Sequence, residues 1–238
     1  KEIMAVSIDK VYQKVLALAN KEQRGYITPQ EFNLFADQAQ MEIFNQYFYD
    51  LEQFKRRPGS EIKFADLGDL ILEKIDVFGT SLYDVVDNFD FSTITDFYRL
   101  ETAYLVKGST FAVVTPVEKV TIEQFVHAAS GPLTRSTNQR PQYRLQNNTI
   151  RFNPSNNPIG NYVCYYTLKP VKPNWGYVVV NDKPLYNSTA STDFELHISE
   201  ETELVYRILV LAGVAVEKPQ LVQTAAGLVT AQIQQEKQ

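Results

Sequence analysis

The feature that most constrains the fold is a long helical pattern between Thr28 and Lys55. Aromatic and aliphatic side chains recur there at intervals of three and four residues, which predicts one amphipathic helix of unusual length. Thr28 is a favourable N-cap, Pro29 suits the first helical position, and Glu31 occupies the acidic position of a capping box. Phe32 begins the apolar stripe, which other elements must cover.

Two shorter helices are predicted on either side of this one, from Ser7 to Asn20 and from Phe64 to Ile75. Gly25 is expected to take a positive φ in the turn after the first helix, and Tyr26 leads into the long helix. Because the connection is short, the first two helices are expected to form an antiparallel pair.

After about Asp96 the pattern changes from helical to alternating, which indicates strands. Asn147-Asn148 is typical of a two-residue hairpin turn, since Asn tolerates the left-handed conformation. A second capping box, Thr121 to Gln124, predicts a short helix within this region. Strands are predicted at 97–106, 111–114, 142–146, 149–152, 162–168, 177–180 and 194–198.

Helical patterns return at the C-terminal end, from Ser199 to Gly213 and from Gln220 towards Gln235. Helices followed by strands and then helices favour an α+β fold over an alternating α/β sheet. We expect an N-terminal helical hairpin or bundle at 1–94 and a mostly antiparallel β region at 95–198. The C-terminal helices, 199–238, are expected to pack on the N-terminal ones.

Charge is unevenly distributed along the 238 residues. The chain has a net charge of −5, yet the stretch from Gln124 to Asn181 contains no Asp or Glu and six Lys or Arg. This asymmetry predicts one electropositive and one electronegative face, which suits contact with a partner. The basic residues of the stretch are Arg135, Arg140, Arg144, Arg151, Lys169 and Lys172.

The sequence shows no catalytic motif. His127, His197 and Cys164 are each explained by packing or by helix ends, and no cofactor or metal site is predicted. The acidic residues between Asp84 and Asp90 lack the glycine and the glutamate of an EF-hand loop, so a polar turn is expected there. No apolar run approaches the roughly 20 residues of a membrane span, so no membrane contact is expected.

Arginines and tyrosines alternate in the basic stretch, which leaves a nucleic-acid-binding module as an alternative. Sparse positive charge and an acidic chain argue against it, because dedicated DNA-binding proteins are usually strongly basic. A virion-associated hydrolase with paired carboxylates is the second alternative. Trp175 suits either stacking on a ligand or packing over the neighbouring prolines.

Three segments of the chain carry a resemblance to a known family: Ala19–Pro29 with Phe32-Asn33, Leu168–Trp175, and Ile208–Val214 followed by a Gln-rich end. In this order they resemble virion structural proteins of crAss-like and related Bacteroidetes-infecting tailed phages, which form neck or tail rings. The likeness lies in structural motifs, so it implies no active-site residue.

The resemblance implies a non-enzymatic subunit of a homo-oligomeric ring in the virion, of twelve copies, between portal and tail. Its partners would be copies of itself, the adjacent portal, neck and tail proteins, and DNA that passes without tight binding. An acidic lumen would suit such a conduit, because each DNA phosphate that a basic side chain neutralises adds affinity and would hold the passing DNA. The residues predicted to form the subunit interface are Arg135, Arg140, Arg144, Arg151, Lys169, Lys172 and Trp175.

Overall fold

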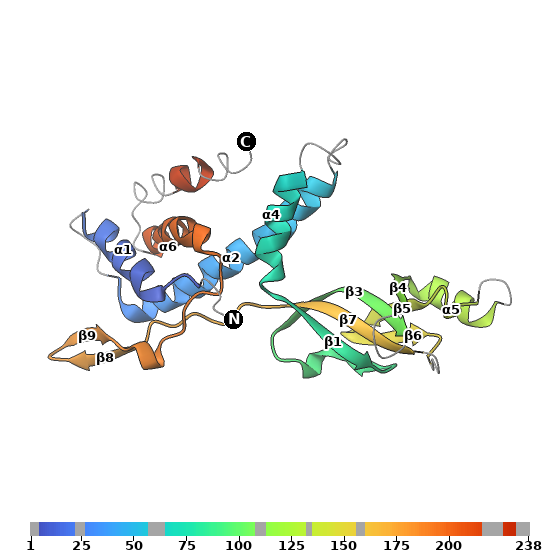
Figure 1. Cartoon of the computed structure of the whole chain (residues 1–238). Helices are drawn as coiled ribbons and strands as arrows, with labels where there is room; N and C mark the ends of the chain where they lie inside the picture. The colour runs from blue at the N-terminus through green and yellow to red at the C-terminus, as the bar shows by residue number, and fades with distance from the viewer. Residues whose placement is uncertain are drawn as a thin grey trace. The chain divides into compact units, whose positions relative to one another are not determined.

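The protein has an α+β fold, as predicted, and consists of two compact units (Figure 1). Unit 1 comprises Lys1–Val77 and Pro170–Gln238, and unit 2 comprises Phe78–Lys169. The structure is a computed structural model that describes residues 5–21, 27–56, 65–107, 113–131, 135–155, 160–215 and 226–231. Gly25 and Tyr26 lie outside these residues.

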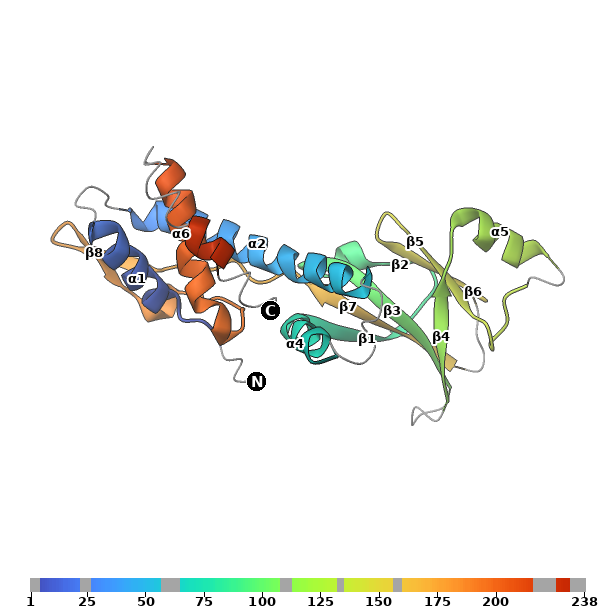
Figure 2. The same cartoon turned by 90° about the horizontal axis from the view of Figure 1, so that it is seen from above.

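Unit 1 is built on helices α1 (Ile8–Lys21), α2 (Pro29–Arg56), α4 (Ala65–Asp76) and α6 (Glu201–Ala215). Helix α6 packs against both α1 and α2, and α4 packs against α2 (Figure 2). The first C-terminal helix therefore returns to the N-terminal helices. The largest fully buried side chains of this core are Ile8, Phe32, Ile43, Phe44, Phe194, Leu196, Leu204 and Ile208.

The predicted capping box begins helix α2. The Thr28 amide donates to Glu31 Oε2 at 2.9 Å, and the Glu31 amide donates to Thr28 Oγ1 at 3.3 Å. The Thr28 amide and the Thr28 hydroxyl both donate to the Glu31 carboxylate, and these two hydrogen bonds lower the pKa of Glu31. Phe32, one turn later, is fully buried. The capping box therefore sets the first turn of α2 and, with it, the position of the first buried side chain of its apolar stripe.

The connector at 170–176 lies along α2 and is held by two polar side chains of that helix. Gln40, which is fully buried, donates to the Val171 carbonyl at 2.9 Å and accepts from the Glu195 amide at 3.2 Å. Asn33 accepts from the Trp175 amide at 2.7 Å. These bonds satisfy backbone groups of an extended segment whose strand-like pairing is a single bridge, Asn174 with Thr192.

Unit 2 is a seven-stranded sheet with the order β1-β7-β3-β4-β5-β6-β2, antiparallel except where β4 meets β5. One short helix, α5 (Ile122–Ser130), begins with the predicted capping box at Thr121. The strands are β1 (Gly79–Val85), β2 (Phe89–Asp90), β3 (Phe97–Lys107), β4 (Val113–Lys119), β5 (Gln142–Gln146), β6 (Thr149–Asn153) and β7 (Gly160–Leu168).

The sheet of unit 2 curls over its own core. Phe152 on β6 stacks on Tyr162 of β7 with ring centroids 3.8 Å apart, although three strands separate β6 from β7 in the sheet order. The predicted hairpin turn joins β5 to β6, with Asn147 and Asn148 both at positive φ. Stacked aromatic rings of this kind contribute beyond the area that they bury.

Two parts of the chain differ from the sequence-based prediction. Strands β1 and β2 lie where a polar turn and helical region were expected, because β1 pairs along β7 and long-range pairing overrides a weak local pattern. The segment 194–198 is not a strand of the β region. Phe194 forms a single bridge with Val6 and is buried in unit 1, beside Asp193, which accepts from the Ile8 amide.

The sequence pattern puts domain divisions at 94/95 and 198/199, whereas the compact units divide at 77/78 and 169/170. The pairing of β1 with β7 accounts for the first difference, because it draws residues 79–85 into the sheet. The hydrogen bonds of the 170–176 connector to α2 account for the second.

The acidic residues that resemble a calcium loop accept hydrogen bonds within unit 2. Asp87 Oδ1 accepts from the Phe152 amide at 2.8 Å, and Asp90 Oδ1 accepts from the Ser92 amide at 2.8 Å. Asp84 has a positive φ at the irregularity in β1 and accepts from the Asn161 amide group. Asp90 therefore caps the 3-10 turn that follows it, whereas Asp87 and Asp84 join their segment to β6 and β7.

Candidate subunit interface

The seven residues predicted to form the subunit interface do not lie together in one unit. Five of the basic residues are in unit 2, while Lys172 and Trp175 are in unit 1. Lys172 Nζ lies 3.5 Å from Asp37 on α2, so it has a partner within its own chain. Contact of the other basic residues with a neighbouring subunit stays a prediction.

Within unit 2, Arg144 and Arg151 are directly opposite each other on β5 and β6. The Arg144 guanidinium lies 5.6 Å from the centre of the Phe125 ring and donates to Gln146 at 2.7 Å. Arg135, Arg140, Arg151 and Lys169 are exposed. Exposed arginines on a sheet suit rim contacts, which set orientation more than affinity.

Trp175 is a core residue of unit 1, only 4% exposed. Its Nε1 donates to Asp9 Oδ1 at 3.0 Å, and its ring lies 4.3 Å from that of Tyr12 on α1. The ring therefore gives no surface to another subunit or to a stacked ligand. Its role is to fix the segment that follows it in the chain.

That segment is a two-stranded hairpin, hereafter the arm, formed by β8 (Tyr177–Val180) and β9 (Lys183–Tyr186). Asn181 and Asp182 join the strands with φ of 50° and 60°, the signature of a type I′ turn. The sequence predicts β8, but the second strand was missed. The signal was an Asn-Asp pair between two short β-prone runs, the same kind of signal that identifies the 147–148 turn.

The base of the arm is held rigidly. The Trp175 ring stacks on Tyr177 and Tyr186, each with centroids 5.8 Å away. Gly176 has no room for a side chain, since a Cβ there would lie 2.6 Å from the Ala190 backbone, and its amide donates to Ser191 Oγ at 3.0 Å. The arm is therefore presented in one position relative to its own base.

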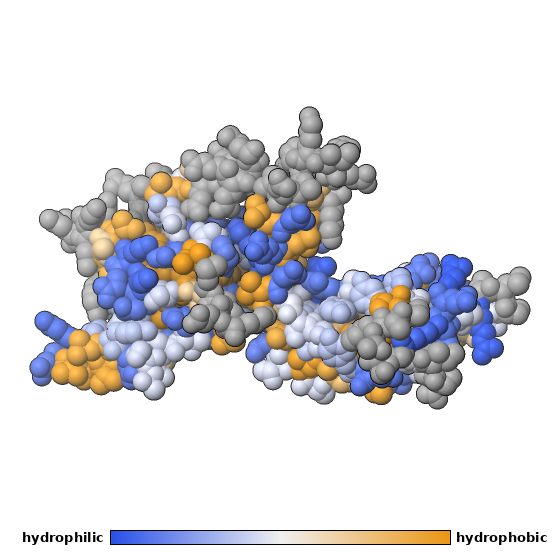
Figure 3. Space-filling view, in the orientation of Figure 1, coloured by the Kyte–Doolittle hydropathy of each residue, from blue (hydrophilic) through white to orange (hydrophobic). Residues whose placement is uncertain are grey.

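Beyond its base the arm exposes apolar side chains on both faces. One face carries Val178, Val180 and Leu185 with Lys183, and the other carries Val179 beside Pro184, as their cross-strand register shows. Val178 and Val179 are 50% and 60% exposed. Figure 3 shows this apolar surface gathered over the β8–β9 hairpin. A two-stranded hairpin is marginally stable alone, so such a surface marks a contact site.

Unit 2 has a depression on the outer face of its sheet, hereafter the hollow, of about 370 Å³, lined by valines together with tyrosines and polar side chains. Val106 and Val163 lie at its floor and are buried, while Val114 and Tyr165 are exposed at its walls. Tyr104 packs edge-to-face on Tyr165. The lining is completed by Glu101 and Thr102.

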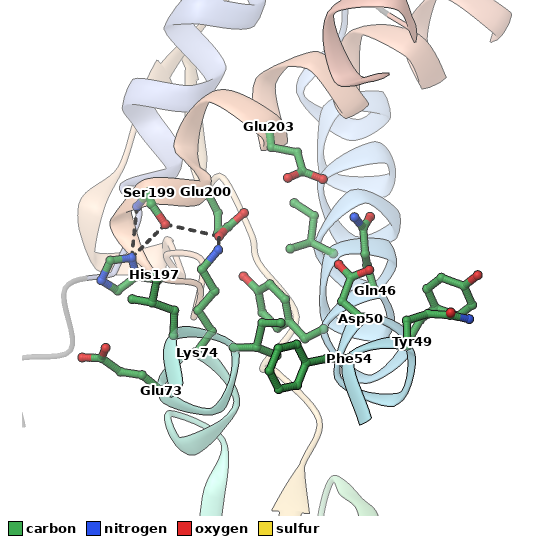
Figure 4. Close-up of a pocket in the computed structure, with 15 residues that line it drawn as sticks. Gln46, Tyr49, Asp50, Phe54, Glu73, Lys74, His197, Ser199, Glu200 and Glu203 are labelled. Carbon is green, nitrogen blue, oxygen red and sulfur yellow. Dashed lines mark hydrogen bonds and ion pairs between the residues drawn. The ribbon is translucent and has the colours of Figure 1, made fainter. Parts of the chain in front are cut away.

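Unit 1 contains a larger cavity of about 610 Å³ between α2, α4 and the start of α6 (Figure 4). Ion pairs line it: Lys74 Nζ lies 2.5 Å from Glu200, which is 1% exposed, and Arg207 pairs with buried Glu203 at 2.5 Å. Removing one member of such a pair strands a buried charge, so Lys74 joins α4 to the turn before α6, and Arg207, which also lies 3.5 Å from Glu42, joins α6 to α2.

A Ser-His-Glu group borders this cavity (Figure 4). His197 Nδ1 lies 2.9 Å from Ser199 Oγ, which lies 3.2 Å from Glu200. In a catalytic triad the imidazole stands between serine and acid, whereas here serine stands between the other two. His197 Nδ1 also accepts from the Ser199 amide, so the histidine acts as the cap of the 3-10 turn Ile198–Glu200.

The aromatic residues of the basic stretch are not available as a nucleic-acid platform. Tyr143, Phe152, Tyr162 and Tyr166 are buried in the core of unit 2, and Tyr165 is exposed. Stacking on successive bases needs several exposed rings. This arrangement disfavours the nucleic-acid alternative.

Within the ranges that the structure describes, no helix combines the length and the apolar character that a membrane crossing requires. Those same ranges contain no group of three His, Cys, Asp or Glu side chains placed to hold a metal ion. No protein-family model matches the chain, and no curated protein matches it.

Proposed function

We propose that this chain is a structural subunit that assembles with copies of itself into a ring, in the neck or tail of a tailed phage between portal and tail. The observation that carries the proposal is the arm, whose base is rigid and whose apolar side chains are uncovered on both faces. An exposed strand pair of this kind is a template for another chain.

The charges of the two units support assembly with defined orientation. Unit 2 contains seven Asp or Glu and eight Lys or Arg, a net charge of +1, while unit 1 contains 21 and 15, a net charge of −6. Opposite charge on two parts of one chain favours head-to-tail contacts between copies. Such heterologous contacts close into rings when the rotation allows it.

The placement of the ring in a phage neck rests on the resemblance, which implies twelve copies and a DNA conduit. An acidic protein suits this role, because DNA must slide without being held. The Ser-His-Glu group does not favour the hydrolase alternative, since it serves as a helix cap.

The proposal is tested by electron microscopy of the purified full chain, alone and with neighbouring neck proteins. Closed rings of one size are the expected result. Particles of monomer size in every mixture, or turnover of a cell-wall substrate by the monomer, would overturn the proposal.

A further inference from the structure

Resting on the proposed function, we infer that the arm of one subunit docks in the hollow on the sheet of the next copy. A head-to-tail ring needs two different surfaces on one chain, and a projecting arm with apolar side chains needs a concave acceptor that offers apolar contacts. Arm and hollow are the pair of surfaces in the described residues that meets these conditions.

The arm carries a face that matches the hollow in chemistry. Val178, Val180 and Leu185 lie on that face with a single cation, Lys183. The hollow contains a single charged residue, Glu101, whose Oε1 accepts from Thr167 Oγ1 at 2.6 Å. Apolar side chains of the arm would pack over Val106 and Val163 beside the Tyr104–Tyr165 pair, and Lys183 would meet the Glu101 carboxylate, so no charge is buried alone.

The geometry is that of one small sheet packed on another. The hollow spans β3, β4 and β7, and the arm is a two-stranded ribbon whose side chains stand out from both faces. Sheets pack face to face by interdigitating such side chains. Val114 and Tyr165, which are exposed at the walls, would be covered.

The cavity of unit 1 is a poorer acceptor. Its lining includes Asp50, Glu73, Glu200 and Glu203 against one cation, Lys74. The arm brings one lysine and, at its turn, Asp182. The two buried glutamates already have cationic partners, Lys74 and Arg207, so Lys183 of an entering arm would gain no new ion pair with them.

Disulfide trapping in the full chain tests the inference. Val178→Cys and Val114→Cys variants are prepared separately, mixed, and oxidised mildly; the matched control replaces Val178→Cys with Val179→Cys, on the opposite face of the arm. Native Cys164 is fully buried and gives no background product. We expect at least tenfold more covalent dimer from the first mixture than from the control.

A chain carrying both Val178→Cys and Val114→Cys separates head-to-tail docking from arm-to-arm pairing. Head-to-tail docking gives a ladder of covalent multimers beyond the dimer. A dimer formed by Val178→Cys alone, or equal yields from the two faces, would overturn the inference. So would rings that form without any disulfide between arm and hollow, and the proposed function would then survive. If wild-type protein forms no assembly, the proposed function fails as well.

Discussion

The sheet of unit 2 and the arm of unit 1 are both rich in β-branched and aromatic residues, but their strand edges differ. The edge strand β1 is interrupted by an irregularity at Asp84, and the other edge, β2, has two residues. In the arm, β8 presents three successive valines at an uninterrupted edge. Bulges and short strands protect edges from unwanted pairing.

The two regions differ in whether their apolar side chains are covered within one chain. The sheet buries Phe152, Tyr162 and Cys164 against its own strands, whereas the arm buries little beyond the rings at its base. The same residue types therefore form a buried core in the sheet of unit 2 and an exposed apolar surface in the arm.

Thiol reactivity should differ most between the two regions. Burial raises the pKa of Cys164 in β7 to about 12 from its ordinary value of 9.0, so at pH 8 it has about a thousandfold less thiolate than a cysteine of ordinary pKa. In a Val178→Cys variant, kept too dilute to assemble, a thiol reagent should label one group rapidly. Cys164 should be labelled after unfolding. Equal rates in the folded protein would contradict the contrast.

The same pKa shift gives a pH dependence of stability. Because the folded pKa of Cys164 is raised, its contribution is complete below the unfolded pKa, near 9, and is lost as pH rises towards 12. Burial also raises the pKa of Tyr143, which acts in the same direction. The urea concentration at the unfolding midpoint should decrease as the pH rises from about 9 towards 12, and the decrease should be smaller in a Cys164→Ala variant. A midpoint that rises over this range would contradict the burial.

Truncating a core ring should cost far more than truncating the arm. Phe152→Ala removes the stack on Tyr162 and should lower the free energy of unfolding by about 3–5 kcal/mol. Val178→Ala, at a half-exposed site, should change it by less than about 0.5 kcal/mol. Urea unfolding followed by circular dichroism measures both. A large loss from the arm variant would mean that the arm is part of the monomer core.

The smallest effect is expected from the proposed charge pair between subunits. Glu101→Lys and Lys183→Glu should each weaken assembly several-fold, since exposed ion pairs contribute about 0.2–1 kcal/mol, and the double exchange should restore it. Lys119→Glu, an exposed charge reversal elsewhere in unit 2, is the control. Single variants that assemble like wild type, or a double variant that assembles more weakly than either single variant, would contradict a contact between Glu101 and Lys183.

Local signals predicted much of the fold. The capping boxes at Thr28 and Thr121 and the Asn147-Asn148 turn depend on residues within a few positions of one another, and all three were confirmed. Strand β1 was missed because its pairing with β7 joins residues about 80 positions apart. Such pairing leaves little trace in a short segment.

The candidate interface was harder to predict than the fold. Charge indicated the basic stretch, but Trp175 is in the core and Lys172 pairs within its own unit. Which face of a strand stays uncovered depends on tertiary packing, so the exposure of Val178 and Val179 could not be inferred from composition. The turn at Asn181-Asp182 was a detectable signal of the arm.

The most direct test of the central claim is the mass of the wild-type chain, compared with Val178→Asp, by light scattering over a range of concentrations. Val126→Asp is the matched control, because Val126 is an exposed valine on α5, 57% against 50% exposed. We expect wild type and control to form one closed assembly, and Val178→Asp to raise the protein concentration needed for assembly by at least about tenfold. A wild-type chain that stays monomeric throughout, or an arm variant that assembles like wild type, would contradict it.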